Sequence, residues 1–294
     1  MSAANVRTGI GGWTFEPWRG TFYPDKLPQA KELEFASRAL RTIEINGTYY
    51  RSQTPATYAK WAEAVPDGFV FSLKGPRFAT NRRILAEAGE SISRFLDSGP
   101  TMLGDHLGPM LWQFAPTKKF DAADFGAFLA LLPKTFDGRK LRHVVEVRHP
   151  TFQCPEFVAL LREFEIPVVY ADHPEYPAIA DVTGDFVYAR LQKGEDDIPT
   201  GYAPKDIAAW AKAAATWAEG GAPEKTAADV VAPPSKAVKA KPRDVFVYFI
   251  SGGKIRAPAA AQALAEALGT PTPTAATGVA KPAKAAVKTA KRKT

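Results

Sequence analysis

Short runs rich in β-branched and aromatic residues recur along this chain, and most of them are followed by a segment with helical patterning. The β-rich runs are 6–13, 41–46, 69–74, 110–114, 143–148, 167–172, 186–191 and 245–250, and the helical segments include 31–40, 55–65, 124–132, 155–164, 204–219 and 258–268. Proline often opens these helical segments, where its missing N–H leaves no helical hydrogen bond unmade. This alternation predicts an α/β protein, a single (β/α)8 TIM-like barrel.

An open, doubly wound sheet is the competing interpretation of the same alternation. Such a sheet would favour a glycine-rich nucleotide loop after its first strand. Gly9, Gly11 and Gly12 lie near that place, but they do not have the GxGxxG spacing. The connection after the sixth run, 173–180, is too short and too interrupted by proline to form a full helix.

Two segments have a composition that predicts disorder. Residues 220–243, before the last strand, form a low-complexity insertion within a barrel domain of residues 1–268, and residues 269–294 form a tail rich in Ala, Pro and Lys. Neither segment offers enough apolar surface to offset the entropy of ordering. Six basic residues and no acid lie in the last part of the tail, and without them the net charge falls from +7 to +1: Lys281, Lys284, Lys288, Lys291, Arg292 and Lys293.

Several classes of protein are disfavoured. The chain has one cysteine, Cys154, which cannot form an internal disulfide, so a cytoplasmic, reducing location is expected. The first residues have no signal-peptide pattern, and no apolar run is long enough for a membrane span, so no membrane partner is expected. Neither a G-x-S-x-G elbow nor a P-loop occurs.

Most of the β-rich runs carry a polar or aromatic group near the end. In chain order these residues are Trp13, Glu44, Asn46, Lys74, Gln113, Glu146, Arg148, Asp172, Arg190 and Tyr248. Side chains alternate between the two faces of a strand, and the apolar neighbours suit the face toward the helices. The polar set should therefore point into the barrel at the C-terminal ends of the strands, which is where barrel enzymes hold their catalytic groups.

Within this set Glu146 and Arg148 are expected on one face of one strand. Residues two apart lie about 6.5–7 Å from each other along a strand, which suits a shared ligand better than a tight isolated ion pair. His149 follows Arg148 and is either a further ligand contact or a loop residue with a satisfied hydrogen bond. Trp13 and Tyr248 are either walls of the pocket or core aromatics.

A carboxylate-rich metal site is an open alternative. Glu44, Glu146 and Asp172 could bind a divalent cation such as Mg²⁺ or Mn²⁺, with His149 as a fourth ligand. The cations expected in the same ring, from Lys74, Arg148 and Arg190, could neutralise the carboxylates directly, so no metal or other cofactor is required.

The motifs around these residues resemble those of the YecE-like family, also called domain of unknown function 72. They are Gly12-Trp13 with Tyr23-Pro24, EINGTYY at 44–50, FSLKGP at 71–76, LGPMLWQF at 107–114, VEVRHPTF at 145–152 and YARL at 188–191. The resemblance covers 8–268 apart from the insertion. It implies a TIM-like barrel and no established reaction.

The residues favour an enzyme, of hydrolase, lyase or isomerase type, that acts on a small anionic or polar substrate such as a phosphorylated or sugar-like compound. The basic residues Lys74, Arg148 and Arg190 would hold the anion. Glu44, Glu146 and Asp172 would supply general acid and base catalysis. The remaining contacts would be Trp13, Asn46, Tyr49, Gln113, His149 and Tyr248.

Three other functions stay open. One is a metal-dependent hydrolase or isomerase. Another is a nucleic-acid-associated protein whose basic tail contacts phosphates. The third is a sensor that binds a ligand in the same pocket without catalysis.

Overall fold

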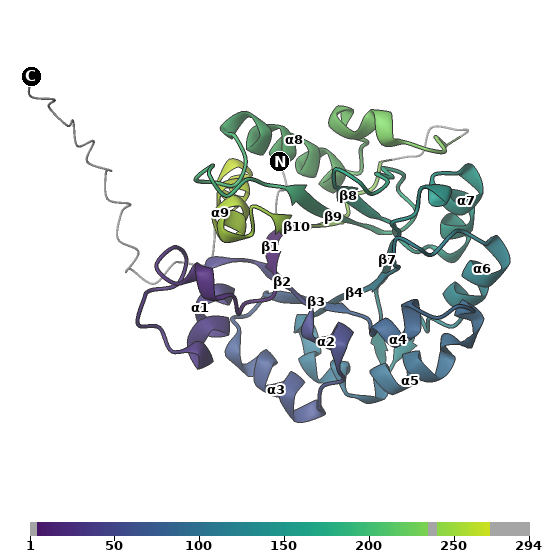
Figure 1. Ribbon diagram of the computed structural model, residues 1–294, viewed down its shortest axis with the longest axis horizontal. Coiled ribbons are helices and arrows are strands. Elements are labelled where there is room, and N and C mark those ends of the chain that lie inside the picture. Colours follow the sequence, from purple (N-terminus) through teal and green to yellow (C-terminus); the bar gives the residue numbers. More distant parts are fainter. Residues whose placement is uncertain (1–4, 235–239, 271–294) are drawn as a thin grey trace, which may run out of the picture.

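Eight parallel strands form an inner ring with the helices on its outer side (Figure 1). The computed structural model describes residues 5–234 and 240–270. The strands are β1 (Val6–Gly11), β2 (Thr42–Ile45), β3 (Val70–Lys74), β4 (Leu107–Gln113), β7 (His143–Glu146), β8 (Val169–Asp172), β9 (Phe186–Lys193) and β10 (Asp244–Gly252). Each strand overlaps one of the predicted runs, so the predicted barrel is confirmed.

The order of the strands around the ring is β7-β4-β3-β2-β1-β10-β9-β8. At the seam between β7 and β8 the pairing is reduced to one parallel bridge, Val145 with Val168. There the Val145 N–H donates to the carbonyl oxygen of Pro167 over 3.0 Å. The barrel is therefore nearly closed, and its weakest lateral pairing lies beside the strand that carries Glu146.

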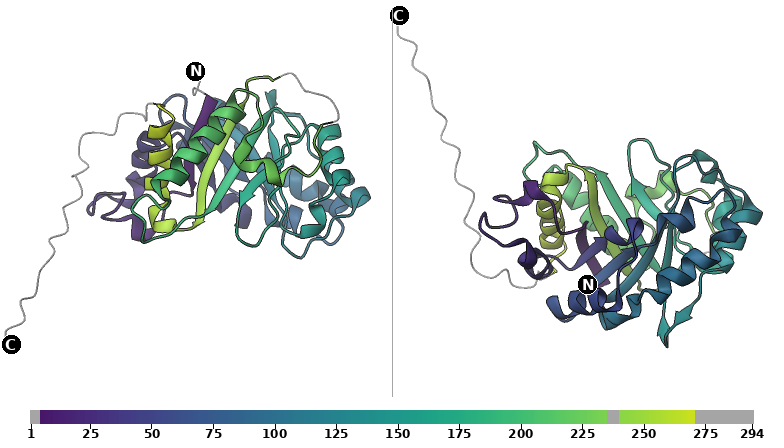
Figure 2. Two further views of the ribbon diagram at one scale, coloured as in Figure 1. Left: turned by 90° about the horizontal axis from the view of Figure 1, so that it is seen from above. Right: turned by 60° about the horizontal axis from the view of Figure 1, so that its bottom comes forward.

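The helices cover the outside of the ring. They are α1 (Glu32–Ala39), α2 (Gly47–Tyr50), α3 (Pro55–Ala64), α4 (Arg77–Thr80), α5 (Gly89–Asp97), α6 (Ala122–Ala130), α7 (Pro155–Phe164), α8 (Pro204–Ala218) and α9 (Ala257–Ala267). Thr54 and Asp121 cap α3 and α6 by accepting backbone N–H groups. Helices α8 and α9 lie side by side over the outer face of the last strand (Figure 2). A small hairpin, β5 (Thr135–Phe136) with β6 (Arg139–Lys140), precedes β7.

Apolar side chains fill the interior of the barrel, as the alternation of faces requires. This inner cluster consists of Leu111, Val144, Val169, Phe186, Tyr188, Phe246 and Tyr248. Arg7 and Arg142 pair with Asp244 over 3.2 and 2.6 Å, at the N-terminal end of β10. The inner cluster thus lies between these ion pairs at the N-terminal end of β10 and the polar residues at the C-terminal ends of the strands.

The insertion departs from the sequence-based expectation. Its described part contains the 3-10 helix η7 (Glu224–Asp229). The Asp181 carboxylate accepts the N–H groups of Val231 and Ala232 over 2.7 and 3.0 Å, and the Tyr170 hydroxyl donates to Asp229 over 2.8 Å. The prediction of disorder is therefore wrong for this anchored stretch. A few specific hydrogen bonds hold it in place although its composition offers little apolar surface to bury.

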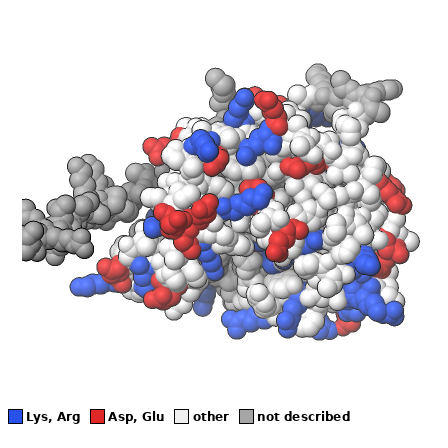
Figure 3. All heavy atoms as spheres, turned by 45° about the horizontal axis from the view of Figure 1, so that its top comes forward, with Lys and Arg blue, Asp and Glu red and all other residues white. Residues whose placement is uncertain are grey.

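Residues 235–239 and the tail from residue 271 lie outside the described residues, so the predicted tail is not tested. No helix in the described part of the chain combines the length and the apolar character that crossing a membrane requires. Basic and acidic side chains are interspersed over the face shown in Figure 3.

Candidate active site

Arg190 bridges two buried glutamates at the C-terminal ends of the strands. Its Nε and Nη2 donate to the two carboxylate oxygens of Glu44 over 3.2 and 3.0 Å, and its Nη1 donates to Glu146 Oε2 over 2.5 Å. The three residues come from β9, β2 and β7, and each side chain is at most 3% exposed. These three of the predicted polar residues thus meet at one end of the barrel.

The electrostatics of this bridge hold its members ionised. Burial alone would raise the pKa of Glu146, but Arg190 and Arg148, together with the Gln113 hydrogen bond, lower it to about 2. Burial opposes the charge of Arg190, and the two glutamates more than offset this, so the pKa of Arg190 is raised. A buried charged group is tolerated only with this kind of pairing.

A tyrosine layer supports the bridge from within the barrel. The Tyr188 hydroxyl donates to Glu44 Oε2 over 2.7 Å and lies 2.9 Å from Ser72 Oγ. Burial and the Glu44 carboxylate raise the pKa of Tyr188 well above its ordinary value, so its hydroxyl remains a donor. Tyr248 lies beside Tyr188, with ring centroids 4.8 Å apart, and its hydroxyl is 2.7 Å from Thr42 Oγ1. Tyr248 is fully buried and therefore belongs to the core of the barrel.

Glu146 has two further partners toward the opening. Gln113 Nε2 donates to its Oε2, and Arg148 Nε donates to its Oε1, each over 2.9 Å. Glu146 and Arg148 are therefore in closer contact than the spacing along the strand suggested, but the pair is not isolated, because Glu146 also accepts from Arg190. Arg148 also lies over the ring of Tyr176, 4.5 Å from its centroid, and Tyr176 stacks on His173.

We call Glu44, Lys74, Glu146, Arg148 and Arg190 the ion-pair cluster. Lys74 differs from the two arginines of this cluster. It is only 7% exposed, and its Nζ lies over the ring of Tyr49, 4.3 Å from the centroid. Among the described residues no carboxylate oxygen lies within 4.0 Å of this Nζ. Burial first, and then Arg190, lower the pKa of Lys74 to about 8, although Glu44 and Glu146 act in the opposite direction.

The cluster therefore carries more positive than negative charge. Lys74, Arg148 and Arg190 contribute three cations, and Glu44 and Glu146 contribute two anions.

Asn46, at the N-terminus of α2, is half-buried and directly faces Gly11, where an added Cβ would lie only 3.0 Å from Asn46 Nδ2. Glycine at position 11 leaves the space that this amide occupies.

Asp172 is not placed in the cluster. Its strand neighbour on the same face, Tyr170, packs on Trp210 and Trp217 of α8, so this face points toward the helices. Asp172 pairs instead with Lys193 over 2.8 Å. The expectation that Asp172 faces into the barrel is wrong, because the inward residue of β8 in the inner cluster is Val169.

Two other predicted contacts have structural partners elsewhere. The Trp13 ring packs edge-to-face on Trp61 of α3, on the side of the helices. His149 caps its own turn, because its Nδ1 accepts the Thr151 N–H over 3.2 Å and lies 2.9 Å from Thr151 Oγ1. Trp13 is therefore a core aromatic, and His149 is a loop residue with a satisfied hydrogen bond, which are the two alternatives that the sequence left open.

The residues proposed for a metal site do not assemble into one. Glu44 and Glu146 are bridged by Arg190, while Asp172 and His149 have the separate partners described above. Within 5–234 and 240–270 no group of three or more His, Cys, Asp and Glu side chains is arranged to hold a metal ion. The donor set thus fits an ion-pair network rather than a carboxylate metal centre.

Sequence reasoning missed Ser72 and Tyr176. Ser72 lies two positions before Lys74 on β3, so the two side chains point to the same face of the strand. This alternation is the signal that could have revealed Ser72. Tyr176 lies in the loop after β8, and no strand periodicity predicts that its ring lies under Arg148.

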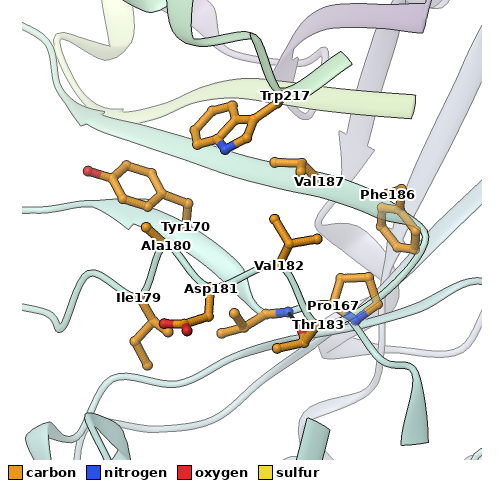
Figure 4. A pocket seen from close by; sticks show the side chains of 11 residues that line it. Pro167, Tyr170, Ile179, Ala180, Asp181, Val182, Thr183, Phe186, Val187 and Trp217 are labelled. Carbon is orange, nitrogen blue, oxygen red and sulfur yellow. Dashed lines mark hydrogen bonds between the residues drawn. The ribbon is translucent and has the colours of Figure 1, made fainter. Parts of the chain in front are cut away.

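A cavity lies apart from this cluster, on the helix-facing side of β8 and β9. In Figure 4, Trp217 and Val187 line its upper side and Pro167 and Thr183 its lower side. Its volume is about 10 Å³, which is at the lower limit for one water molecule. None of the charged strand-end residues lines it, so we place the candidate site at the ion-pair cluster.

Comparison with known proteins gives a family but no reaction. The family model described as "Protein of unknown function DUF72" matches residues 7–285. A DUF72 family protein from Enterococcus faecalis V583 superposes with a TM-score of 0.64 at 18% identity, covering 90% of this chain and 96% of that chain. A DUF72 family protein from Thermotoga maritima MSB8 gives a TM-score of 0.61 at 20% identity, covering 88% of this chain and 96% of that chain. No curated protein matches. Because the family model covers nearly the whole chain, the protein belongs to the DUF72 family.

Proposed function

We propose that this DUF72 protein is an enzyme that binds a small anionic substrate at the barrel opening, with Lys74 and Arg148 as the cationic contacts. The observation that carries this proposal is the position of Lys74, a buried ammonium group without a carboxylate within 4.0 Å in the described residues. A buried charge of this kind is costly unless a counter-ion completes it. An anionic ligand group would supply that counter-ion.

Arg148 supports the same proposal from the other side of the cluster. Its Nε donates a hydrogen bond to Glu146, and its guanidinium group lies over the ring of Tyr176. The Arg148 side chain is 18% exposed. Neither of its terminal nitrogens has a hydrogen-bond partner among residues 5–234 and 240–270. Two such nitrogens on one guanidinium match the spacing of phosphate or carboxylate oxygens.

The glutamates receive a different role from the one expected from sequence alone. Glu146, with its pKa near 2, is ionised at neutral pH and is a weak base. Lys74, with its pKa near 8, exchanges a proton much closer to neutrality. We therefore assign proton transfer to Lys74, while Glu44 and Glu146 hold Arg190 and set the charge of the site.

Thermal denaturation with and without inorganic phosphate or sulfate tests the binding step. The parent should be stabilised by either anion, and Lys74→Met should lose that stabilisation. Lys225→Met is a matched control, because Lys225 also lies over an aromatic ring, Trp210, at 4.3 Å, but outside the cluster. Equal stabilisation of the parent and Lys74→Met would overturn the assignment.

An activity screen separates catalysis from binding alone. Phosphoesters and phosphorylated or acidic sugars are suitable substrates, since they carry the anionic group that the site would hold. Turnover that disappears in Lys74→Met and persists in Lys225→Met would support an enzyme. Anion binding without turnover across the screen would favour a ligand-binding protein that uses the same contacts.

A further inference from the structure

We propose that Lys74 is a nucleophile that forms an imine with the carbonyl carbon of an anionic aldehyde or keto compound. This inference rests on the proposed function, because Arg148 would hold the anionic group of the same substrate. It names a narrower class of substrate, in which a carbonyl group lies close to a carboxylate or phosphate.

The placement of Lys74 meets the structural requirements for such a nucleophile. The residue ends β3, with the same parity as the inward-facing Ser72, so its side chain extends from the barrel interior toward the opening. It is more than nine-tenths buried, and none of the described side chains accepts a hydrogen bond from its Nζ. A lysine that must act as a free amine cannot be committed to a salt bridge.

The charges around the amine act in both directions. Arg190 and Arg148 disfavour a further positive charge, whereas Glu44 and Glu146 favour it from beyond ion-pair distance. The ring of Tyr49 also favours the ammonium form. Burial is the largest influence, and it lowers the pKa of Lys74 to about 8, so a larger fraction of this amine is neutral near pH 7 than of an ordinary lysine. Desolvation and a neighbouring cation are the two means by which proteins activate lysine toward carbonyl groups.

The chemical step needs no oxidant or reductant. The nitrogen lone pair of Lys74 attacks the carbonyl carbon, a C–N bond forms, and the carbonyl oxygen takes up the proton that the nitrogen loses. The resulting carbinolamine then loses its oxygen as water, with the second proton of the nitrogen, to leave the imine. Glu146 and Glu44, which stay paired to Arg190, are not consumed in this step.

Reductive trapping tests the inference on the full chain. The protein is treated with glyoxylate, a small anionic aldehyde, and cyanoborohydride, whose hydride converts an imine into a stable carboxymethyl amine. Peptide mass spectrometry then compares the adduct at Lys74 with the adduct at the exposed Lys225 in the same molecule. At about pH 7 we expect at least about tenfold more adduct at Lys74, because far more of it is neutral than of an ordinary lysine. This internal comparison requires no variant that might fail to fold.

The outcomes separate this inference from the proposed function. Adduct at Lys74 no greater than at Lys225 would overturn the imine, and phosphate stabilisation would then show whether anion binding still holds. Acetaldehyde, a neutral aldehyde, provides the second comparison. Labelling of Lys74 by glyoxylate well above that by acetaldehyde would support an anionic carbonyl substrate. Equal labelling would overturn the anionic part of the substrate class, whereas the proposed anion site is decided separately by stabilisation with phosphate or sulfate.

Discussion

Arg148 donates its Nε hydrogen to Glu146 Oε1 over 2.9 Å, although the two residues are separated by only one position in the chain. Glu146 also accepts from Arg190 and Gln113 on its other oxygen. The carboxylate therefore keeps two hydrogen-bond partners without Arg148, whose terminal nitrogens have no partner among residues 5–234 and 240–270. This redundancy indicates that Arg148 contributes more to the site than the charge balance of Glu146.

Arg148→Met should lower the free energy of unfolding by only about 1–3 kcal/mol, because one oxygen of Glu146 loses its partner while the other keeps two. It should also abolish stabilisation by phosphate or sulfate. Thermal and urea denaturation with and without these anions measure both effects. Arg139→Met, which removes an exposed pair with Asp105, is the control. A loss of about 3–5 kcal/mol, with no anion effect in the parent, would instead indicate a purely structural arginine.

Arg190→Met should be much more damaging, at about 3–5 kcal/mol, because it leaves Glu44 and Glu146 buried without their shared cation. Arg190→Lys should recover little of this loss, since an ammonium group cannot reproduce the two-nitrogen contact with Glu44. Urea denaturation measures these differences, and the exposed Arg94→Met provides the baseline. Unfolding of Arg190→Met at the same urea concentration as the parent would show that the bridge does not hold the barrel together.

The barrel and most of its polar ring were predictable because strand alternation is a local property. Glu44, Gln113, Glu146 and Arg190 all point inward as their parity requires, and the structure joins them through hydrogen bonds. The alternation of side chains does not predict which face points inward where both faces of a strand carry polar and aromatic residues. Tyr170 could face either side, since its ring suits a core and its hydroxyl suits a polar site, and its contact with α8 turns Asp172 away from the cluster.

The remaining errors concern contacts between segments distant in sequence. Composition indicated disorder near η7, but Asp181 and Tyr170, roughly 50 or more residues earlier, hold this segment by hydrogen bonds. The stacking of Arg148 on Tyr176 likewise joins two loops. Such contacts depend on the closed barrel, and a residue pattern read along the chain does not contain them.

Asp181→Ala should loosen the insertion while leaving the barrel folded. Its buried carboxylate accepts two backbone N–H groups and pairs with Arg162 over 3.2 Å. Losing these bonds should cost about 1–3 kcal/mol and make residues 223–234 more accessible to local opening. Limited trypsin digestion should then cut faster after Lys225 in the variant. Asp185→Ala, which removes an exposed partner of Lys140, is the control. Cleavage at the parent's rate would mean that other contacts anchor the segment.

The acid sensitivity of the protein should depend on two buried groups that act in different pH ranges. Glu146 has a folded pKa of about 2, below its ordinary value of 4.5, so its contribution is present above 4.5 and is lost as the pH falls toward 2. His143 donates from Nε2 to the Pro133 oxygen and accepts from Trp112. Burial lowers its pKa from 6.5 to about 4, so its contribution is lost earlier, between these two values.

Glu146→Gln should therefore flatten the stability profile only at its acidic end. From about pH 5 to about pH 3 the parent should lose about 2 kcal/mol that the variant does not lose, because only the carboxylate must be protonated. The variant should still show the loss at higher pH that His143 causes. Urea midpoints measured at several pH values for the parent, Glu146→Gln and the exposed Glu63→Gln provide the comparison. Parallel losses in the parent and Glu146→Gln over the acidic range would show that the Arg190 bridge does not hold Glu146 ionised.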